Sequence, residues 1–198
     1  VLEDIFQPHN ASAVLRNCDL FGVQDVHIIE SRNTFAPNKE VALGTDRWLT
    51  LHRYADRGDN DARSDGLAAL KSAGYLIAAT CPYGDAIPIT EVPLDAPIAL
   101  CFGSEKPGLS DHLLDAADLR VTLPMVGMAE SFNISVSAAL CLYELTDTLR
   151  ASDHPWPLTD AEKLVLSLGW AKRGMRNIAE IERRFDERRA EHLAARNS

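Results

Sequence analysis

The sequence predicts an α/β fold in which helices cover both faces of a mostly parallel sheet. Short apolar stretches typical of strands alternate along the chain with longer stretches typical of helices. Such alternation indicates a parallel sheet, because each crossover connection lays a helix on one of its faces. The chain has 198 residues, of which 46% are hydrophobic, and this suits one domain with or without a helical appendage.

The first half of the chain begins with a strand expected over residues 1–6. A helix should follow over residues 9–22, with Asn10 as its N-cap and Gly22 as its stop. The helix residues expected to face the core are Ala13, Val14, Cys18 and Phe21. The next expected elements are a strand over 25–30, a loop over 31–39, a strand over 48–54 and a helix over 62–74.

The second half continues the alternation and ends in a charged tail. Its expected elements are strands over 75–80, 97–103 and 119–125, a helix over 110–117, and a long helix from Ser131 to Leu149. Residues 153–159 look like a linker, and Asp160 to Arg196 have the pattern of a charged helix. We therefore expect one domain over 1–150 and a helical extension over 151–198.

The long helix opens with small hydrogen-bonding side chains, although its second half is apolar. These side chains are Glu130, Ser131, Asn133, Ser135 and Ser137. Because the first amides of a helix have no internal partners, such residues either cap the helix or hold a ligand there. At this point both interpretations stand.

The apolar residues of this helix form two neighbouring stripes. The first stripe comprises Ile134, Ala138, Cys141 and Leu145, and the second comprises Val136, Leu140 and Tyr143. One face of a sheet cannot cover both, so we expect one stripe to meet a second copy of the chain in a homodimer.

The charge distribution is uneven along the chain. The net charge of −9 argues weakly against a nucleic-acid binder. From Thr159 onward, however, nine Lys or Arg stand against seven Asp or Glu. Contact with RNA would therefore use local patches, the arginines of the tail, or residues that precede Val1. Alternatively, the tail is simply a solvated helix with Glu–Arg pairs.

Cysteine and histidine usage gives no sign of a metal site. Cys18, Cys81, Cys101 and Cys141 lie in or beside apolar runs without a C-x-x-C pair, which is typical of reduced core residues in a cytoplasmic protein. The histidines lack the spacing of metal ligands, so no metal is expected. No apolar stretch reaches the roughly 20 residues of a membrane span, and the start lacks a signal-peptide pattern.

Three segments are chemically unusual for loops at the ends of strands. They are QPHNASAVLRN, with Arg16 on a helix, FGSEKPGLS, with Glu105 between Gly103 and Gly108, and LPMVGMAESFN. In an open α/β sheet, ligands bind at loops that leave the carboxyl ends of the strands. Alternatively, Arg16 is a solvated helix residue and FGSEKPGLS is an ordinary strand-to-helix turn.

Common nucleotide-binding and hydrolase motifs are absent from the sequence. FGSEKPGLS resembles a phosphate-binding loop, but Leu109 occupies the position of the obligatory Lys. The sequence contains neither the G-x-G-x-x-G of dinucleotide-binding folds nor the G-x-S-x-G of a nucleophile elbow.

Three ordered motifs carry a specific resemblance to a known family. NASAVLRNCDLFGV, ALCFGSEKPGLS and LPMVGMAESFNISVSAALCLYE resemble the motifs of the TrmH (SpoU) branch of the SPOUT RNA 2′-O-methyltransferases. The match spans residues 1 to about 150 in the right order. PHNASAVLRNCD and VGMAESFNISVS look most like the tRNA guanosine-2′-O-methyltransferases of this branch.

The resemblance implies a parallel α/β domain with a C-terminal deep trefoil knot, working as a homodimer that binds S-adenosylmethionine. By position, the implied cofactor residues are Thr80, Gly103, Glu105, Gly108, Leu123, Met125 and Phe132. The positions that match the family's catalytic and substrate residues are Asn10, Arg16, Glu105, Ser131 and Asn133.

The implied reaction is methyl transfer from S-adenosylmethionine to a ribose 2′-hydroxyl of structured RNA, and the motifs favour a guanosine of tRNA. The alternatives are a ribosomal RNA substrate or a knotted RNA-binding module without catalysis. The resemblance gives Arg16 the task of taking the hydroxyl proton. Because a free guanidinium is a poor base, Arg16 could instead clamp an RNA phosphate.

Overall fold

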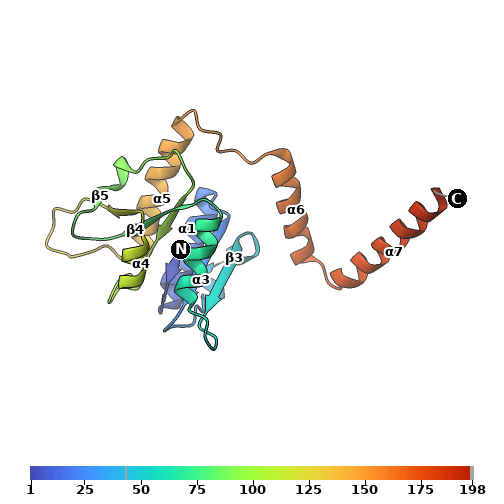
Figure 1. The fold of residues 1–198 in the computed structure, drawn as a ribbon, viewed down its shortest axis with the longest axis horizontal. Coiled ribbons are helices and arrows are strands. Elements are labelled where there is room, and N and C mark those ends of the chain that lie inside the picture. The colour runs from blue at the N-terminus through green and yellow to red at the C-terminus, as the bar shows by residue number, and fades with distance from the viewer. Residues whose placement is uncertain (43, 197–198) are drawn as a thin grey trace. The chain divides into compact units, whose positions relative to one another are not determined.

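The computed structural model describes residues 1–42 and 44–196 and divides the chain into two compact units (Figure 1). The first unit runs from Val1 to Trp156, and the second begins at Pro157. Among the described residues, no helix combines the length and the apolar character needed to cross a membrane.

The first unit is built on parallel strands that form two hydrogen-bonded groups. The strands are β1 Leu2–Glu3, β2 Asp25–Glu30, β3 Thr50–Ala55, β4 Leu76–Thr80, β5 Ile87–Pro88, β6 Ile98–Cys101 and β7 Leu119–Thr122. The group orders are β1-β2-β3 and β5-β7-β4-β6, and each strand pair within them is parallel.

A short seam joins the two groups of strands. The Glu3 amide donates to the Phe102 carbonyl at 2.9 Å, and the Phe102 amide donates to the Val1 carbonyl at 2.9 Å. The β1 segment therefore lies between β2 and the end of β6. As a result, the loops after β1 and β6 begin side by side.

Helices cover both faces of the sheet, as the sequence predicts. On one face lie α1 Pro8–Phe21 and α5 Ile134–Ala151, and on the other lie α3 Ala62–Ser72 and α4 Asp111–Ala116. Neighbouring strand residues belong to opposite cores: Ile28 packs with the α1 and α5 side, whereas Ile29 packs with the α3 and α4 side. This alternation requires a sheet that is buried on both faces.

The start of α1 differs from the prediction. The helix begins at Pro8 with Gln7 at the N-cap position, so the assignment of Asn10 as the cap is wrong. Proline is favoured at the first helical position because its fixed φ suits the helix and its missing N–H needs no partner. Gly22 ends the helix with φ 79°, as expected. Among the residues predicted to face the core, Val14 and Cys18 are buried, whereas Ala13 is only half-buried.

Several boundaries shift where local backbone geometry overrides the apolar pattern. The first strand stops early because Asp4 adopts φ 53°. The strand expected at residue 48 begins at Thr50, after a short 3₁₀ helix over Thr45–Arg47, and the predicted loop before it gives way to α2 Lys39–Ala42. The long helix begins at Ile134 rather than Ser131.

The second unit contains α6 Asp160–Gly174 and α7 Ile178–Arg196. The tail from Asp160 is helical, as expected, and the two helices are separated by residues 175–177, where Asn177 adopts φ 59°. Thr159 and Glu162 form a capping box at the start of α6. Within α7, Arg183 forms ion pairs with Glu180 at 2.7 Å and with Glu187 at 2.6 Å.

Candidate functional site

Two adjoining cavities open where the chain leaves the carboxyl ends of β4, β6 and β7. The first has a volume of about 330 Å³. Its walls include all the residues that the resemblance assigns to the cofactor, namely Thr80, Gly103, Glu105, Gly108, Leu123, Met125 and Phe132. The walls also include Ser137 and Cys141 of α5, and Tyr83, which the sequence analysis did not single out.

The second cavity has a volume of about 520 Å³. Its walls include Asn10, Glu105, Ser131 and Asn133, four of the five residues at the implied catalytic positions. The residues common to both cavities are Ser104, Glu105, Lys106, Ser131, Phe132 and Ile134. A ligand in one cavity would therefore lie against a ligand in the other, as a reaction between two bound molecules requires.

The loop after β6 forms part of the wall between the cavities. It turns back on itself so tightly that a Cβ on Gly103 would collide with the backbone of Gly108 and Leu109. Gly108 has φ 94°, which strains any other residue. These two glycines permit a loop that carries Glu105 at its turn and brings backbone groups to the first cavity.

Glu105 is held by two amide side chains that come from distant parts of the sequence. Its Oε1 atom accepts a hydrogen bond from Asn10 Nδ2 at 2.9 Å and another from Asn133 Nδ2 at 3.1 Å. The Asn133 amide also donates to Asn10 Oδ1 at 3.0 Å. The three motifs thus meet in a single hydrogen-bonded cluster, which fixes the direction of the carboxylate.

The cap interpretation of the polar helix start is confirmed for Asn133. Its Oδ1 atom accepts from the Ser135 amide at 2.9 Å and therefore caps α5. Its Nδ2 atom points instead to Glu105 and Asn10. One side chain thus joins the end of a core helix to the polar cluster between the cavities.

Gln7 was missed by the sequence analysis, although it belongs to the same cluster. Its Oε1 atom accepts from Asn10 Nδ2 at 3.1 Å, and its Nε2 atom lies 3.4 Å from Glu105 Oε2. Gln7 and Asn10 are three residues apart at the start of α1, which places them on one side of the helix. Recognising Pro8 as the first helical residue would have revealed this pairing.

Three other polar groups of the first cavity, those of Thr80, Cys81 and Cys141, are already engaged or uncharged. The Thr80 hydroxyl donates to the Cys101 carbonyl at 2.8 Å and so ties β4 to β6. Burial raises the pKa of the Cys141 thiol to about 12, and burial also raises the pKa of Cys81. Both thiols are therefore protonated at neutral pH, and neither is a thiolate nucleophile.

Arg16 is the implied catalytic residue that the structure leaves apart from the others. It lies half-buried on α1 and lines neither cavity. It makes no hydrogen bond or ion pair with another residue of the described chain. Within one chain, the Arg16 guanidinium can therefore bind a ligand, but it lies outside the cluster of Asn10, Glu105 and Asn133.

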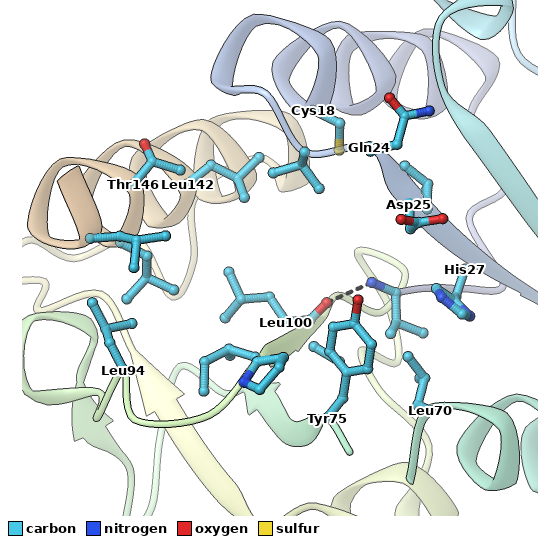
Figure 2. Close-up of a pocket in the computed structure, with 18 of the residues that line it drawn as sticks. Cys18, Gln24, Asp25, His27, Leu70, Tyr75, Leu94, Leu100, Leu142 and Thr146 are labelled. Atoms are coloured by element: carbon cyan, nitrogen blue, oxygen red, sulfur yellow. Dashed lines mark hydrogen bonds between the residues drawn. The ribbon is translucent and has the colours of Figure 1, made fainter. Parts of the chain in front are cut away.

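A larger cavity lies at the opposite end of the sheet. It has a volume of about 570 Å³ and lies beside the amino ends of β2, β4 and β6. Figure 2 shows Leu94, Leu100 and Leu142 around it, with a hydrogen bond from the Val1 amino group to the Leu100 carbonyl at 2.6 Å. Its walls are mainly apolar, and it lacks the cluster of amides and carboxylate found at the carboxyl ends.

Comparison with known proteins agrees with the geometry. Residues 1–143 match the SpoU rRNA Methylase family. The tRNA (guanosine(18)-2′-O)-methyltransferase of Borreliella burgdorferi is 39% identical over 182 residues, which cover 92% of this chain and 81% of the relative.

Solved structures share the fold. The TrmH/SpoU tRNA modifying enzyme of Aquifex aeolicus matches with a TM-score of 0.72 at 24% identity, over 88% of each chain. The SpoU methyltransferase AviRb of Streptomyces viridochromogenes, in complex with the cofactor AdoMet, matches with a TM-score of 0.62 at 23% identity, over 76% of this chain and 60% of that one.

Proposed function

Since the chain belongs to the SpoU rRNA methylase family, we propose that it transfers a methyl group from S-adenosylmethionine to the ribose 2′-hydroxyl of a guanosine in tRNA. The observation that carries this proposal is the pair of adjoining cavities with Glu105 and Ser131 in their common wall. The name of the Borreliella burgdorferi relative supports guanosine and tRNA as the target.

The first cavity suits the cofactor. Leu123, Met125 and Phe132 give it apolar surface, and the loop from Gly103 to Gly108 brings backbone groups close. A mostly apolar pocket with a few fixed polar groups is typical of sites that hold a nucleoside. AviRb, which shares the fold, was solved with AdoMet. When bound, this cofactor supplies a methyl group on a sulfonium, which becomes the 2′-O-methyl group as the hydroxyl gives up its proton.

The second cavity holds the ribose in our proposal. Asn10 and Asn133 orient Glu105 through its Oε1 atom. The Glu105 Oε2 atom has only the long contact with Gln7 at 3.4 Å among the described residues, so it keeps acceptor capacity for a ribose hydroxyl. Fixing the hydroxyl beside the first cavity lowers the barrier by orientation and requires no metal ion.

We also propose that the protein acts as a homodimer. Val136, Leu140 and Tyr143 on α5 are 43%, 40% and 57% exposed and form one apolar stripe. The stripe of Ile134, Ala138 and Cys141 is buried in the core, so only the outer stripe is open to a partner. An isologous contact between two such stripes would cover both.

In this dimer, Arg16 acts on the neighbouring subunit's site. α1 lies alongside α5, where Asn17 donates to the Ser135 carbonyl at 2.8 Å and Phe21 contacts Tyr143 edge to face. Arg16 shares an outer side of α1 with Leu20, which is 73% exposed. A guanidinium at the dimer contact can clamp an RNA phosphate across the partner's second cavity.

Mixed dimers test this arrangement. Arg16→Ala and Asn133→Ala chains should each be inactive alone, whereas mixing the two variants should restore activity in dimers that contain one intact composite site. If the mixture remains inactive while the cofactor still binds, Arg16 serves its own chain.

The strand order supports the trefoil knot, which also belongs to the proposal. β7 lies between β4 and β5, both of which precede it in sequence, as expected if the chain threads back through the 81–118 segment. Action on tRNA is also consistent with a cytoplasmic location, which we propose for the protein.

Transfer of tritium from labelled S-adenosylmethionine tests the proposed function directly. We expect label in bulk tRNA and, after digestion, in 2′-O-methylguanosine. Label in ribosomal RNA instead of tRNA would mean that ribosomal RNA is the substrate. If neither RNA is labelled although the protein binds RNA, the protein is an RNA-binding module without catalysis.

A further inference from the structure

A fourth cavity, of about 260 Å³, borders the second one and has no part in the reaction proposed above. The residues that line both are Phe6, Ser104 and Lys106. On its far side lie Arg32 and Asn33, which follow the end of β2. The surface of the ribose cavity therefore continues past Phe6 toward Arg32.

Phe6 is 73% exposed although Ile5 beside it is only 4% exposed. The backbone before it is held firmly, because Asp4 Oδ1 accepts from the amides of Ser31 at 2.8 Å and Arg32 at 2.7 Å. The Asp4 carbonyl also accepts from Asn33 Nδ2 at 3.0 Å. An aromatic ring is thus presented to solvent from a fixed turn rather than from a loose loop.

The acidic residues under this surface already accept hydrogen bonds from Arg63 and from backbone amides. Glu3 Oε1 pairs with Arg63 Nε at 2.6 Å, and Glu3 Oε2 accepts from the Ser110 amide at 2.7 Å. Asp4 Oδ2 accepts from Arg63 at 3.0 Å. The carboxylates therefore have little capacity left to bind the cations at the rim.

The rim cations keep donor capacity for an anionic ligand. Arg32 lies 3.9 Å from Asp4, a long contact, and its side chain is 57% exposed. Lys106 is exposed and has no hydrogen-bond or ion-pair partner in the described part of the chain. Two cations beside an exposed aromatic ring suit a nucleotide, because the cations can bind its phosphate and the ring can stack on its base.

We propose that Phe6, Arg32 and Lys106 form a flanking-nucleotide site, which holds the RNA nucleotide next to the one that is methylated. Phe6 stacks on the base, and Arg32 and Lys106 bind its phosphate. The site rests on the proposed function, because it receives RNA whose target ribose occupies the adjoining cavity. It makes Phe6 a substrate-positioning residue with no role in cofactor binding.

The aromatic part of the site is tested by substitutions at Phe6, measured as the dissociation constant of bulk tRNA and as KM for methyl transfer. Phe6→Ala should raise both by roughly tenfold, the effect of losing one stacked base. Phe6→Trp should retain the parent values, whereas Phe6→Leu should behave like Phe6→Ala. The affinity for S-adenosylmethionine and the melting temperature should not change.

Trp48→Ala is the matched control, since Trp48 is a 47% exposed aromatic near the amino end of the edge strand β3, whereas Phe6 follows the internal strand β1. This variant should bind tRNA as the parent does. If Phe6→Leu binds tRNA as tightly as Phe6→Trp does, Phe6 does not stack on a base. Its ring then packs against an apolar surface, such as that of a protein partner.

The cationic part is tested by the salt dependence of tRNA binding. Arg32→Ala and Lys106→Ala should each reduce the slope of log affinity against log salt by about one, and Lys71→Ala on the exposed end of α3 should not. Parent-like tRNA binding by the Phe6 and Arg32 variants, while the parent enzyme methylates tRNA, would overturn the flanking-nucleotide site alone. A parent protein that binds tRNA without methylating it would overturn the proposed function, and the Phe6 comparison would still decide the site.

Discussion

The two ends of the sheet carry cavities of different chemical character. At the amino ends, a cavity of about 570 Å³ is surrounded mainly by apolar side chains such as Leu100 and Leu142 (Figure 2). At the carboxyl ends, cavities of about 330 and 520 Å³ meet at a cluster of Asn10, Glu105 and Asn133. The larger space has no such cluster, so our proposal places the reaction at the carboxyl ends because polar groups from distant segments converge there, and not because of cavity volume.

The largest effect should come from separating the two tasks of Asn133. Asn133→Ser keeps a helix cap but is too short to donate to Glu105, whereas Asn133→Ala loses both functions. Both variants should lower the methyl-transfer rate by roughly 10² or more, the low end for a positioned catalytic group. Only the alanine variant should also lose about 1 kcal/mol of stability in urea unfolding.

These two variants test whether the carboxyl ends of the strands, and not the amino ends, carry the proposed reaction. Full activity of Asn133→Ser, together with parent stability, would mean that Asn133 is only a cap. The polar cluster would then have a structural role, and it would no longer support a reaction at the carboxyl ends of the strands.

A smaller effect is expected at the amino-end cavity. Leu142→Ala enlarges an apolar space in the core and should cost about 2–3 kcal/mol in unfolding free energy. The rate of methyl transfer by the folded variant should stay within about twofold of the parent rate, well short of the loss expected from a catalytic group. A loss of cofactor affinity in this variant, measured by calorimetry below its melting temperature, would show that the amino end takes part in the site.

The smallest effect concerns His27, whose side chain lines the same amino-end cavity (Figure 2). Burial, and next the proximity of His52, lower the pKa of His27 to about 4 from its ordinary 6.5. The folded state thus binds fewer protons than the unfolded state between these values, so stability is fully present above pH 6.5 and declines as the pH falls toward 4. Allowing for partial exposure, we expect a loss of about 1–2 kcal/mol.

Urea unfolding of the parent and of His27→Gln at pH 7 and pH 4.5 measures this loss. The difference between the two proteins should shrink or reverse at the lower pH, since glutamine does not titrate. An equal pH dependence in both proteins would assign the loss to other groups. The methyl-transfer rate at pH 7 should be the same in both, because the cavity at the amino ends is outside the reaction.

Much of this arrangement could be predicted from the sequence, because apolar alternation and three ordered motifs are local signals. The parallel α/β class and the two apolar stripes of α5 follow from periodicity, which did not tell that the stripe of Ile134 and Cys141 is the buried one. The family resemblance placed Glu105 and Asn133 together, although they lie 28 residues apart. Periodicity alone could not have done so, because loops carry no period.

The failures have local physical causes. Asn10 looked like a helix cap because asparagine favours that position, but Pro8 starts the helix earlier and turns Asn10 toward Glu105. The two-residue strand β5 is too short to show a strand pattern. The sequence also does not locate the break between α6 and α7, because asparagine tolerates the φ of 59° at Asn177 and no glycine marks the position.

The most direct test of the central claim uses tRNA transcripts in which one nucleotide type at a time carries 2′-deoxyribose. Each transcript is incubated with the protein and tritium-labelled S-adenosylmethionine, and incorporated label is counted. The proposed reaction predicts label in the unmodified transcript and in the deoxyadenosine, deoxycytidine and deoxyuridine transcripts, provided that they fold and bind, but none in the deoxyguanosine transcript. Label in the deoxyguanosine transcript would contradict methyl transfer to a guanosine 2′-hydroxyl.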